Sequence, residues 1–255
     1  MKAWRVHQWG EPESMQWEDV DPPEPPAGHV RIKVSAAAAN FFDILQIQGK
    51  YQVKPPFPFT PGAEVAGIID ALGDGVSGFS VGQPVLAFAS QGAFAELALA
   101  EASRTFAIPD GMAMEEAAAL PIVYHTSWFA LDHRAKLAPG EWLLVHAGAS
   151  GVGMSAIQIG LGMGARVIAT AGSEAKRQFA KDLGAEVVLN YSDAAWVEEV
   201  KRITGGRGAH VIYDPVGGDI LELSTKCIAS EGRMLVIGFA SGRIPSLAAN
   251  RALLK

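Results

Sequence analysis

The chain has 255 residues, of which 49% are hydrophobic and 19% charged, a composition typical of globular proteins rather than disordered or fibrous ones. Its 21 lysines and arginines against 27 aspartates and glutamates give a formal net charge of −6, which argues against sequence-independent binding to nucleic acid or to an anionic membrane. The single cysteine, Cys227, excludes an intramolecular disulfide and a zinc site built on two or more thiolates.

The first residues of the chain do not combine a charged start with an apolar run, so no secretory signal is visible. No uninterrupted apolar stretch approaches the roughly 20 residues that a bilayer-spanning helix needs. We therefore expect a cytoplasmic protein without a membrane contact.

Residues 1–120 are predicted to form a β-rich domain of short strands. Apolar and polar residues alternate along residues 30–34, which is the period of a half-buried strand. Residues 65–69 and 84–89 are two further predicted strands, each bounded by glycines. The proline-rich run at residues 22–26 fits neither a helix nor the interior of a sheet, so we expect a stiff connector there.

Residues 121–255 are predicted to alternate strands and helices. The predicted strands are 142–146, 166–170, 186–189, 209–214 and 234–237, and the predicted helices are 124–131, 151–163, 174–183, 194–204 and 220–229. Short apolar strands separated by helices favour parallel pairing with right-handed crossovers. The sequence therefore predicts an α/β fold in which a doubly wound parallel sheet of the Rossmann type follows the β-rich domain.

A glycine-rich turn connects the first of these strands to the helix that follows it. Small residues let the backbone approach a pyrophosphate, and free amides at a helix N-terminus favour its negative charge. Ser150 stands where the G-x-G-x-x-G pattern has its second glycine. The alternative is a tight turn in another α/β enzyme, including one that binds S-adenosylmethionine. The predicted dinucleotide-binding residues are Gly148, Ala149, Ser150, Gly151, Val152 and Gly153.

The end of the second predicted strand bears on the choice between NADH and NADPH. An Asp or Glu at that place binds the ribose 2′-hydroxyl of NAD and repels a 2′-phosphate, and this chain has neither there. Ser173, Lys176 and Arg177 offer a hydroxyl and two cations to a phosphate, which favours NADPH, although Glu174 weakens this interpretation. The alternative is that Ser173 caps the following helix and the two cations form an ordinary solvated face.

Several segments together carry a family resemblance: residues 40–43 with 49–51, residues 61–67, residues 137–140, the glycine-rich turn and residues 188–191. In these segments the chain resembles the zinc-free quinone oxidoreductase, or zeta-crystallin-like, branch of the medium-chain dehydrogenase/reductase superfamily. The resemblance implies a GroES-like catalytic and substrate domain at residues 1–120 and a Rossmann NADP(H)-binding domain at residues 121–255.

Two positions bear on metal binding. Zinc alcohol dehydrogenases resemble this chain but carry a cysteine where Asn40 stands and a histidine where Ala63 stands. Neither an asparagine amide nor an alanine methyl group binds Zn²⁺ well. The resemblance therefore implies a metal-independent oxidoreductase.

The resemblance also implies that Asn40, Asp43 and Tyr51 lie around the nicotinamide and the substrate. The Asn40 amide would orient a carbonyl or the carboxamide, and Tyr51 would donate a proton or a hydrogen bond to the oxygen that gains charge after hydride transfer. The alternative for Asn40 is an N-cap of a helix that starts at Phe41, and the alternative for Asp43 is a structural hydrogen bond.

For the cofactor, the resemblance implies that Thr126 meets the nicotinamide end, where the backbone at Gly238 and Phe239 also approaches. Lys176 and Tyr191 match positions around the adenosine 2′-phosphate. His146, on the strand before the glycine-rich turn, is predicted to be a core residue with satisfied hydrogen bonds.

The family pattern continues past the last residue of this chain. Members have a sixth Rossmann strand and a return segment that completes the catalytic domain, and neither is present in these 255 residues. The strand at residues 234–237 is therefore predicted to be an unpaired sheet edge. A homodimer is expected if the missing segment is present, because the sixth strand commonly forms the subunit contact.

Taken with the resemblance, the sequence predicts an NADPH-dependent, metal-independent reductase of quinones or α,β-unsaturated carbonyl compounds. The main alternative is an NADPH-binding protein with little catalysis, in a structural or sensor role, because Leu45 replaces a tyrosine often present near the substrate. A methyltransferase that binds S-adenosylmethionine at the same turn is disfavoured by the β-rich domain.

Overall fold

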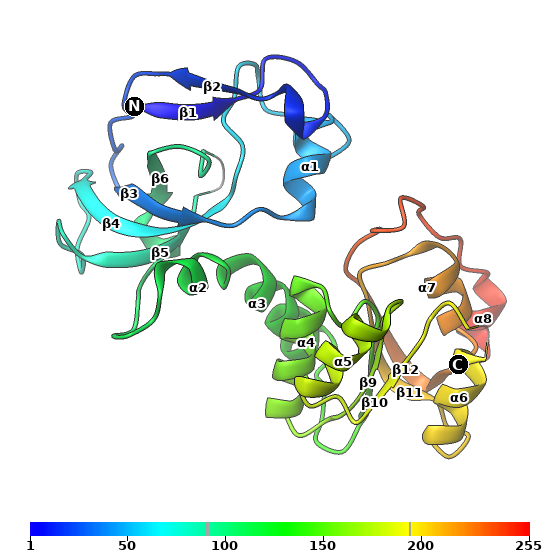
Figure 1. The fold of residues 1–255 in the computed structure, drawn as a ribbon. Helices are drawn as coiled ribbons and strands as arrows, with labels where there is room; N and C mark the ends of the chain where they lie inside the picture. The colour runs from blue at the N-terminus through cyan, green and yellow to red at the C-terminus, as the bar shows by residue number, and fades with distance from the viewer. Residues whose placement is uncertain (90–91, 194) are drawn as a thin grey trace. The chain divides into compact units, whose positions relative to one another are not determined.

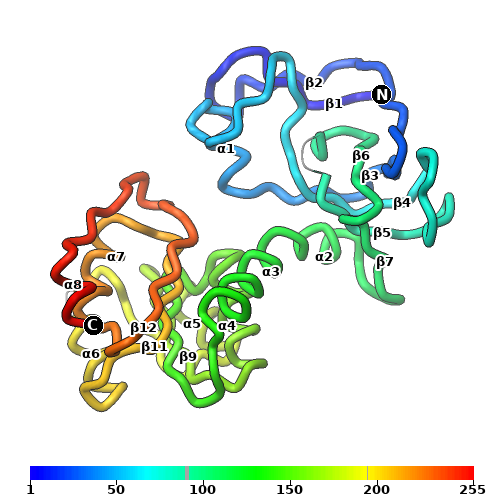
Figure 2. The backbone as a smooth tube through the Cα atoms, turned by 180° about the vertical axis from the view of Figure 1, so that it is seen from behind, coloured from blue at the N-terminus to red at the C-terminus, as the bar shows by residue number. Residues whose placement is uncertain are grey.

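Two five-stranded sheets organise the described part of the chain, one in each half (Figures 1 and 2). The structure is a computed structural model that describes residues 1–89, 92–193 and 195–255. The chain divides into two units, Met1–Ile122 and Val123–Lys255. Within the described ranges, no helix is long and apolar enough to cross a membrane.

The first unit is built on an antiparallel sheet. Its strands are Lys2–Arg5 (β1), Gln16–Asp19 (β2), His29–Ala37 (β3), Glu64–Leu72 (β4), Pro84–Phe88 (β5), Leu97–Glu101 (β6) and Thr105–Ala107 (β7), and its helices are Pro12–Ser14 (η1), Phe41–Ile47 (α1), Ala102–Arg104 (η2) and Met114–Ala118 (α2). The sheet order is β6-β3-β4-β5-β7, with β1 and β2 in a separate pair. As the alternation in β3 predicts, Val30 and Ile32 are fully buried in the core while Lys33 is exposed.

The second unit is built on a parallel sheet in the order β10-β9-β8-β11-β12, which is the predicted doubly wound arrangement. Its strands are Trp142–Val145 (β8), Arg166–Thr170 (β9), Val187–Leu189 (β10), Ala209–Asp214 (β11) and Ile228–Val236 (β12). Helix α3 (Pro121–Trp128) enters this unit, and the other helices are Phe129–Arg134 (η3, a π-helix), Gly151–Gly162 (α4), Glu174–Asp182 (α5), Trp196–Ile203 (α6), Gly218–Ser224 (α7) and Ala249–Leu253 (α8).

Alternate residues of the central strand β8 face two different cores. Leu143 packs in one cluster with residues of α4 and α5, and Leu144 packs in another with residues of α6 and α7. Both leucines are fully buried. The continuous apolar run of β8 follows from this, because a central parallel strand is covered by helices on both faces.

Two predicted helices differ from the structure. The predicted helix 220–229 is wrong in its second half, because α7 ends at Ser224 and residues from Ile228 onward pair with β11 as part of β12. The predicted helix 124–131 begins earlier, at Pro121, since proline is well suited to a first helical turn, and it continues as the π-helix η3. The predicted helix 194–204 starts at residue 194, outside the described residues, and α6 begins at Trp196.

His146 is a core residue, as predicted. Its side chain is fully buried and its two ring nitrogens lie 2.9 Å from Thr170 Oγ1 and 2.8 Å from Ser224 Oγ. The Trp196 ring packs edge-on against it at 5.2 Å between ring centroids. Burial lowers the pKa of His146 to about 3, so the ring is neutral at pH 7. Through these contacts the ring joins β9, α6 and α7.

Candidate functional site

The glycine-rich turn between β8 and α4 is held by Ser150. The Ser150 hydroxyl accepts a hydrogen bond from the Gly153 N–H at 3.1 Å and donates one to the Ala147 carbonyl at 2.8 Å. Ala147 has a φ of 48°, a left-handed conformation that turns the chain from strand to helix. The serine that departs from the glycine pattern therefore has a clear role as the N-cap of α4.

The glycines of the turn allow close packing. A Cβ atom on Gly153 would lie 2.2 Å from the Ala147 carbonyl oxygen, and one on Gly148 would lie 3.0 Å from Ala169 Cβ in the neighbouring strand. The amides of Gly151 and Val152 at the start of α4 have no hydrogen-bond acceptor among the described residues. The turn is thus narrow and presents free N–H groups, which is the environment that a pyrophosphate requires.

The end of β9 carries the residues predicted to bind a 2′-phosphate. The Ser173 hydroxyl accepts the Lys176 N–H at 3.3 Å and so caps α5. Arg177 is occupied, because it pairs with Glu174 and donates to the Gly172 carbonyl. The Lys176 side chain is exposed and has no ion pair among the described residues. Lys176 is therefore the cation that remains available for a ligand.

Tyr191 lies against the same loop. A Cβ atom on Gly172 would be 2.6 Å from the Tyr191 hydroxyl oxygen, so the glycine lets this ring approach the backbone. Tyr191 follows β10 and its side chain is 38% exposed. The structure thus brings Tyr191 to the loop that contains Ser173, from a neighbouring strand of the sheet.

Helix α3 contacts the glycine-rich turn. A Cβ atom on Gly151 would lie 3.0 Å from Val123 Cγ1, and the predicted residue Thr126 lies one turn further along α3. The next residue, Ser127, is buried and lies 2.7 Å from Ser155 Oγ and 2.8 Å from the Tyr213 hydroxyl. This buried hydroxyl group network, which the sequence analysis missed, joins α3, α4 and β11.

Gly238 and Phe239 follow β12 and pack on the turn that follows β11. The Gly238 N–H donates to the Asp214 carbonyl at 3.4 Å, and a Cβ atom on Gly217 would lie 2.8 Å from the Phe239 ring. The Asp214 carboxylate accepts the Val216 N–H at 2.8 Å, and burial raises its pKa. Apart from Thr126, which lies in α3, the predicted cofactor residues in this unit therefore follow the carboxyl ends of parallel strands, which share one edge of the sheet.

In the first unit, Asn40 begins α1 and forms a capping box with Asp43. The Asn40 N–H donates to Asp43 Oδ2 at 2.7 Å, and the Asn40 side-chain nitrogen donates to Glu64 Oε1 at 2.6 Å. The N-cap interpretation of Asn40 is therefore correct, and its amide also reaches a second carboxylate. Glu64, which the sequence analysis did not select, is only 1% exposed.

Asp43 is a buried carboxyl group with a structural hydrogen bond. It is 2% exposed, and its Oδ1 atom has no hydrogen-bond partner in the described structure. Burial, with a smaller contribution from the charge of Glu64, raises the pKa of Asp43 to about 6 against the opposing effect of the amides of Asn40 and Gly62. The alternative role of Asp43, a structural hydrogen bond, is thus visible in the geometry.

Tyr51 is half-buried, and its ring lies 5.5 Å from that of Phe42, between centroids. The Tyr51 N–H donates to the Leu45 carbonyl at 3.1 Å, which fixes the backbone after α1. The Tyr51 hydroxyl makes no hydrogen bond within the described residues, so it is free to meet a ligand. Among the same residues, no group of three or more His, Cys, Asp or Glu side chains is arranged to hold a metal ion.

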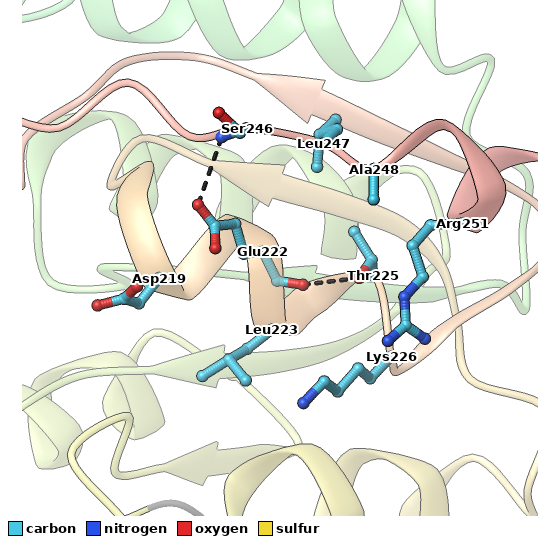
Figure 3. A pocket seen from close by; sticks show the side chains of 9 residues that line it. All are labelled: Asp219, Glu222, Leu223, Thr225, Lys226, Ser246, Leu247, Ala248 and Arg251. Atoms are coloured by element: carbon cyan, nitrogen blue, oxygen red, sulfur yellow. Dashed lines mark hydrogen bonds between the residues drawn. The ribbon is translucent and has the colours of Figure 1, made fainter.

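A separate cavity of about 320 Å³ lies between α7 and the segment that leads into α8 (Figure 3). Glu222 accepts the Ser246 N–H at 3.3 Å across it, and Lys226 and Arg251 extend along one side. None of the residues that line this cavity belongs to the glycine-rich turn. The cavity is therefore distinct from the predicted dinucleotide site.

Two family models match the chain. One described as an alcohol dehydrogenase GroES-like domain matches residues 26–110, and one described as a zinc-binding dehydrogenase matches residues 151–255. Together with the two sheets, these matches confirm the predicted fold class, a GroES-like β-rich domain and a Rossmann domain.

Named relatives extend the comparison. A quinone oxidoreductase-like protein 2 from Mus musculus is 40% identical, over 89% of this chain and 65% of that protein. A quinone oxidoreductase from Rattus norvegicus is 37% identical, over 93% of this chain and 73% of that protein. The structure of an Escherichia coli quinone oxidoreductase complexed with NADPH superimposes with a TM-score of 0.91 at 31% identity, over 100% of this chain and 78% of that one. The chain spans about two thirds of the length of these curated relatives.

Replacing Gly153 by alanine is expected to lower the free energy of unfolding by about 1–3 kcal/mol, because the new methyl group would collide with the Ala147 carbonyl. Gly162→Ala is the matched control in the same helix, where a Cβ atom meets nothing within 4 Å. The control should leave stability unchanged or raise it by up to ~1 kcal/mol. Urea unfolding at pH 7 measures both, and equal effects of the two substitutions would contradict the steric role of Gly153.

Asp43→Asn is expected to change how stability depends on pH. Between pH 3.8 and about 6 the folded protein holds the Asp43 proton that the unfolded chain has lost, so stability falls as the pH rises through this window. The Asp43→Asn variant has no carboxyl group to titrate at this position. Between pH 4 and pH 7, its free energy of unfolding should therefore rise by on the order of 1–2 kcal/mol relative to that of the natural chain. Urea unfolding across that range tests this, and parallel curves for the two proteins would disprove it.

Proposed function

Because the chain belongs to the zinc-free quinone oxidoreductase branch of the medium-chain dehydrogenase/reductase superfamily, we propose that it transfers a hydride from NADPH to quinones or α,β-unsaturated carbonyl compounds. The observation that carries the proposal is the turn from Gly148 to Gly153, in which the amides of Gly151 and Val152 have no acceptor among the described residues and Gly153 has no room for a Cβ atom. The relative from Escherichia coli, solved with NADPH, supports the same cofactor.

The second unit is proposed to bind the dinucleotide. The residues of the glycine-rich turn would hold the pyrophosphate, and Thr126, Gly238 and Phe239 would hold the nicotinamide end. Ser173, Lys176 and Tyr191 would hold the 2′-phosphate, with Lys176 as the cationic partner because Arg177 is already paired. When bound, NADPH supplies the hydride, and the protein supplies orientation and charge stabilisation.

The first unit is proposed to act on the substrate through Asn40 and Tyr51. The Asn40 amide would donate a hydrogen bond to the substrate carbonyl oxygen, which becomes more negative when a hydride adds to the conjugated system. The Tyr51 hydroxyl, which has no hydrogen-bond partner among the described residues, or water would supply the proton that this oxygen or the adjacent carbon then takes up. Asp43 would support Asn40 through the capping box rather than touch the substrate.

Leu45 favours one alternative function, an NADPH-binding protein with little catalysis. By the family resemblance, the Leu45 side chain stands where a tyrosine is often present, and its carbonyl accepts a hydrogen bond from the Tyr51 N–H. A protein that binds NADPH but turns over slowly, in a structural or sensor role, would have the same cofactor residues and a weaker proton donor. Turnover separates the two functions, since binding is common to both.

Turnover of simple quinones and enones by the 255-residue chain is the direct test. We expect NADPH oxidation, followed by absorbance, that depends on both the protein and the acceptor. If the chain binds NADPH in a fluorescence titration but reduces none of these quinones and enones, the proposed reductase activity is disproved and the alternative is supported. Binding of S-adenosylmethionine without NADPH binding would exclude both.

Lys176→Ala is expected to weaken NADPH binding about tenfold, or ~1.4 kcal/mol, and to leave NADH binding unchanged. The reason is that only NADPH has the 2′-phosphate that this cation would pair with. Lys181→Ala is the matched control on the same helix, because the Lys181 ammonium group already donates to the Glu186 carbonyl. Fluorescence titration measures the affinities of the natural chain and of the two variants for both cofactors. Tighter binding of NADH than of NADPH by the natural chain would refute the phosphate role.

A further inference from the structure

The buried carboxylate of Glu64 joins two elements of the first unit. Glu64 begins β4, and its Oε1 atom accepts a hydrogen bond from the Asn40 side-chain nitrogen at 2.6 Å. Its Oε2 atom accepts the Ile122 N–H, in the first turn of α3, at 2.7 Å. Both oxygens are therefore used, and both partners are donors.

These bonds determine which way the Asn40 amide is turned. An ionised carboxylate accepts hydrogen bonds and donates none, so the amide nitrogen of Asn40 must face Glu64. The Asn40 side-chain oxygen faces the Asp43 amide in the capping box. One N–H of the Asn40 amide remains, on a side chain that is only partly buried.

We propose that Glu64 is a positioning residue that holds the Asn40 amide with its second N–H directed to the carbonyl oxygen of the substrate. This inference rests on the proposed function, because it assigns the donor that the quinone or enone oxygen would meet. A quinone oxygen is an acceptor, so it requires a donor and gains from one as negative charge develops on it. Glu64 itself touches no substrate and acts through Asn40.

Replacement by glutamine shows why the carboxylate matters. The Ile122 N–H can only donate, so the glutamine oxygen would have to face Ile122 and its NH₂ group would face Asn40. Asn40 would then have to turn its oxygen toward that NH₂ group and its nitrogen toward the Asp43 amide, where two donors would meet. Glu64→Gln therefore keeps the shape of the side chain and reverses or disorders the Asn40 amide.

A purely structural role of Glu64 makes a different prediction. Glu64→Asp shortens the side chain but keeps a group that only accepts hydrogen bonds, so the amide of Asn40 is not turned over. If packing alone mattered, the shorter aspartate would be worse than the glutamine of the same size. If amide orientation matters, glutamine is the more damaging replacement for catalysis.

The test is a double-mutant cycle measured with NADPH and a simple quinone. We expect Glu64→Gln and Asn40→Ala each to lower kcat by about tenfold or more, with a smaller change in KM for the quinone and no change in NADPH affinity. The double variant should lose no more than the larger single loss, because both changes remove the same N–H. Glu64→Asp should retain more of kcat than Glu64→Gln.

A control separates this effect from general destabilisation. Thr105 is buried in the same unit, and its hydroxyl donates to the Glu101 carbonyl at 2.9 Å. Thr105→Val should lower the Tm and leave kcat unchanged. Losses of kcat that multiply in the double variant, or that are larger for aspartate than for glutamine, would each overturn the proposal. So would a loss of kcat in Thr105→Val as large as that in Glu64→Gln, because kcat would then merely follow the Tm.

A spectroscopic measurement distinguishes failure of this inference from failure of the proposed function. In nitrogen-15 NMR spectra, the Asn40 side-chain amide should show one proton shifted far downfield by its short bond to the carboxylate, and Glu64→Gln should abolish that shift. A natural chain without turnover overturns the proposed function, and with it any role of Glu64 in that reaction. Absence of the downfield signal overturns the placement of Asn40 by Glu64, whether or not turnover is seen.

Discussion

The contact between the start of α4 and the end of β8 is possible only because residue 153 has no side chain. The helix lies so close to the Ala147 carbonyl that any Cβ atom would collide with it. This closeness lets Ser150 cap the helix and sets the surface on which α3 packs through Val123. The next two amides, at the start of the helix, have no acceptor among the described residues. The proposed cofactor site is therefore a product of packing as much as of charge.

Buried ionisable groups hold the chain at several places where a loop or a helix begins. Asp214 holds the turn after β11, His146 joins its strand to Thr170 and Ser224, and Glu64 joins α1 to α3. Each group is withdrawn from water and forms hydrogen bonds with partners, which lie on other elements for His146 and Glu64 and in the following turn for Asp214. Asp43 is the exception, because one of its oxygens has no partner in the described part of the chain, and its raised pKa follows from its burial.

Most of the fold follows from the sequence because its signals are periodic. The alternation in β3, the apolar run of β8 and the glycines between strands and helices each arise from a repeated local geometry. The sequence predicted too late an end for α7, because Ile228 and Ala229 suit a helix as well as a strand. Only the pairing of β12 with β11 decides between the two. Glu64 was missed for a related reason, since nothing in a strand's pattern shows that a carboxylate will meet an asparagine 24 positions away.

The boundary between the two units falls inside a hydrogen-bonded helix. Ile122 belongs to the first unit and Val123 to the second, yet both are residues of α3. A cut at the boundary would leave Ile122 in the first half without the rest of α3, the helix that holds its amide toward the buried carboxylate of Glu64. Either half prepared alone would therefore need the whole of α3, so the same eight residues would have to be copied into both.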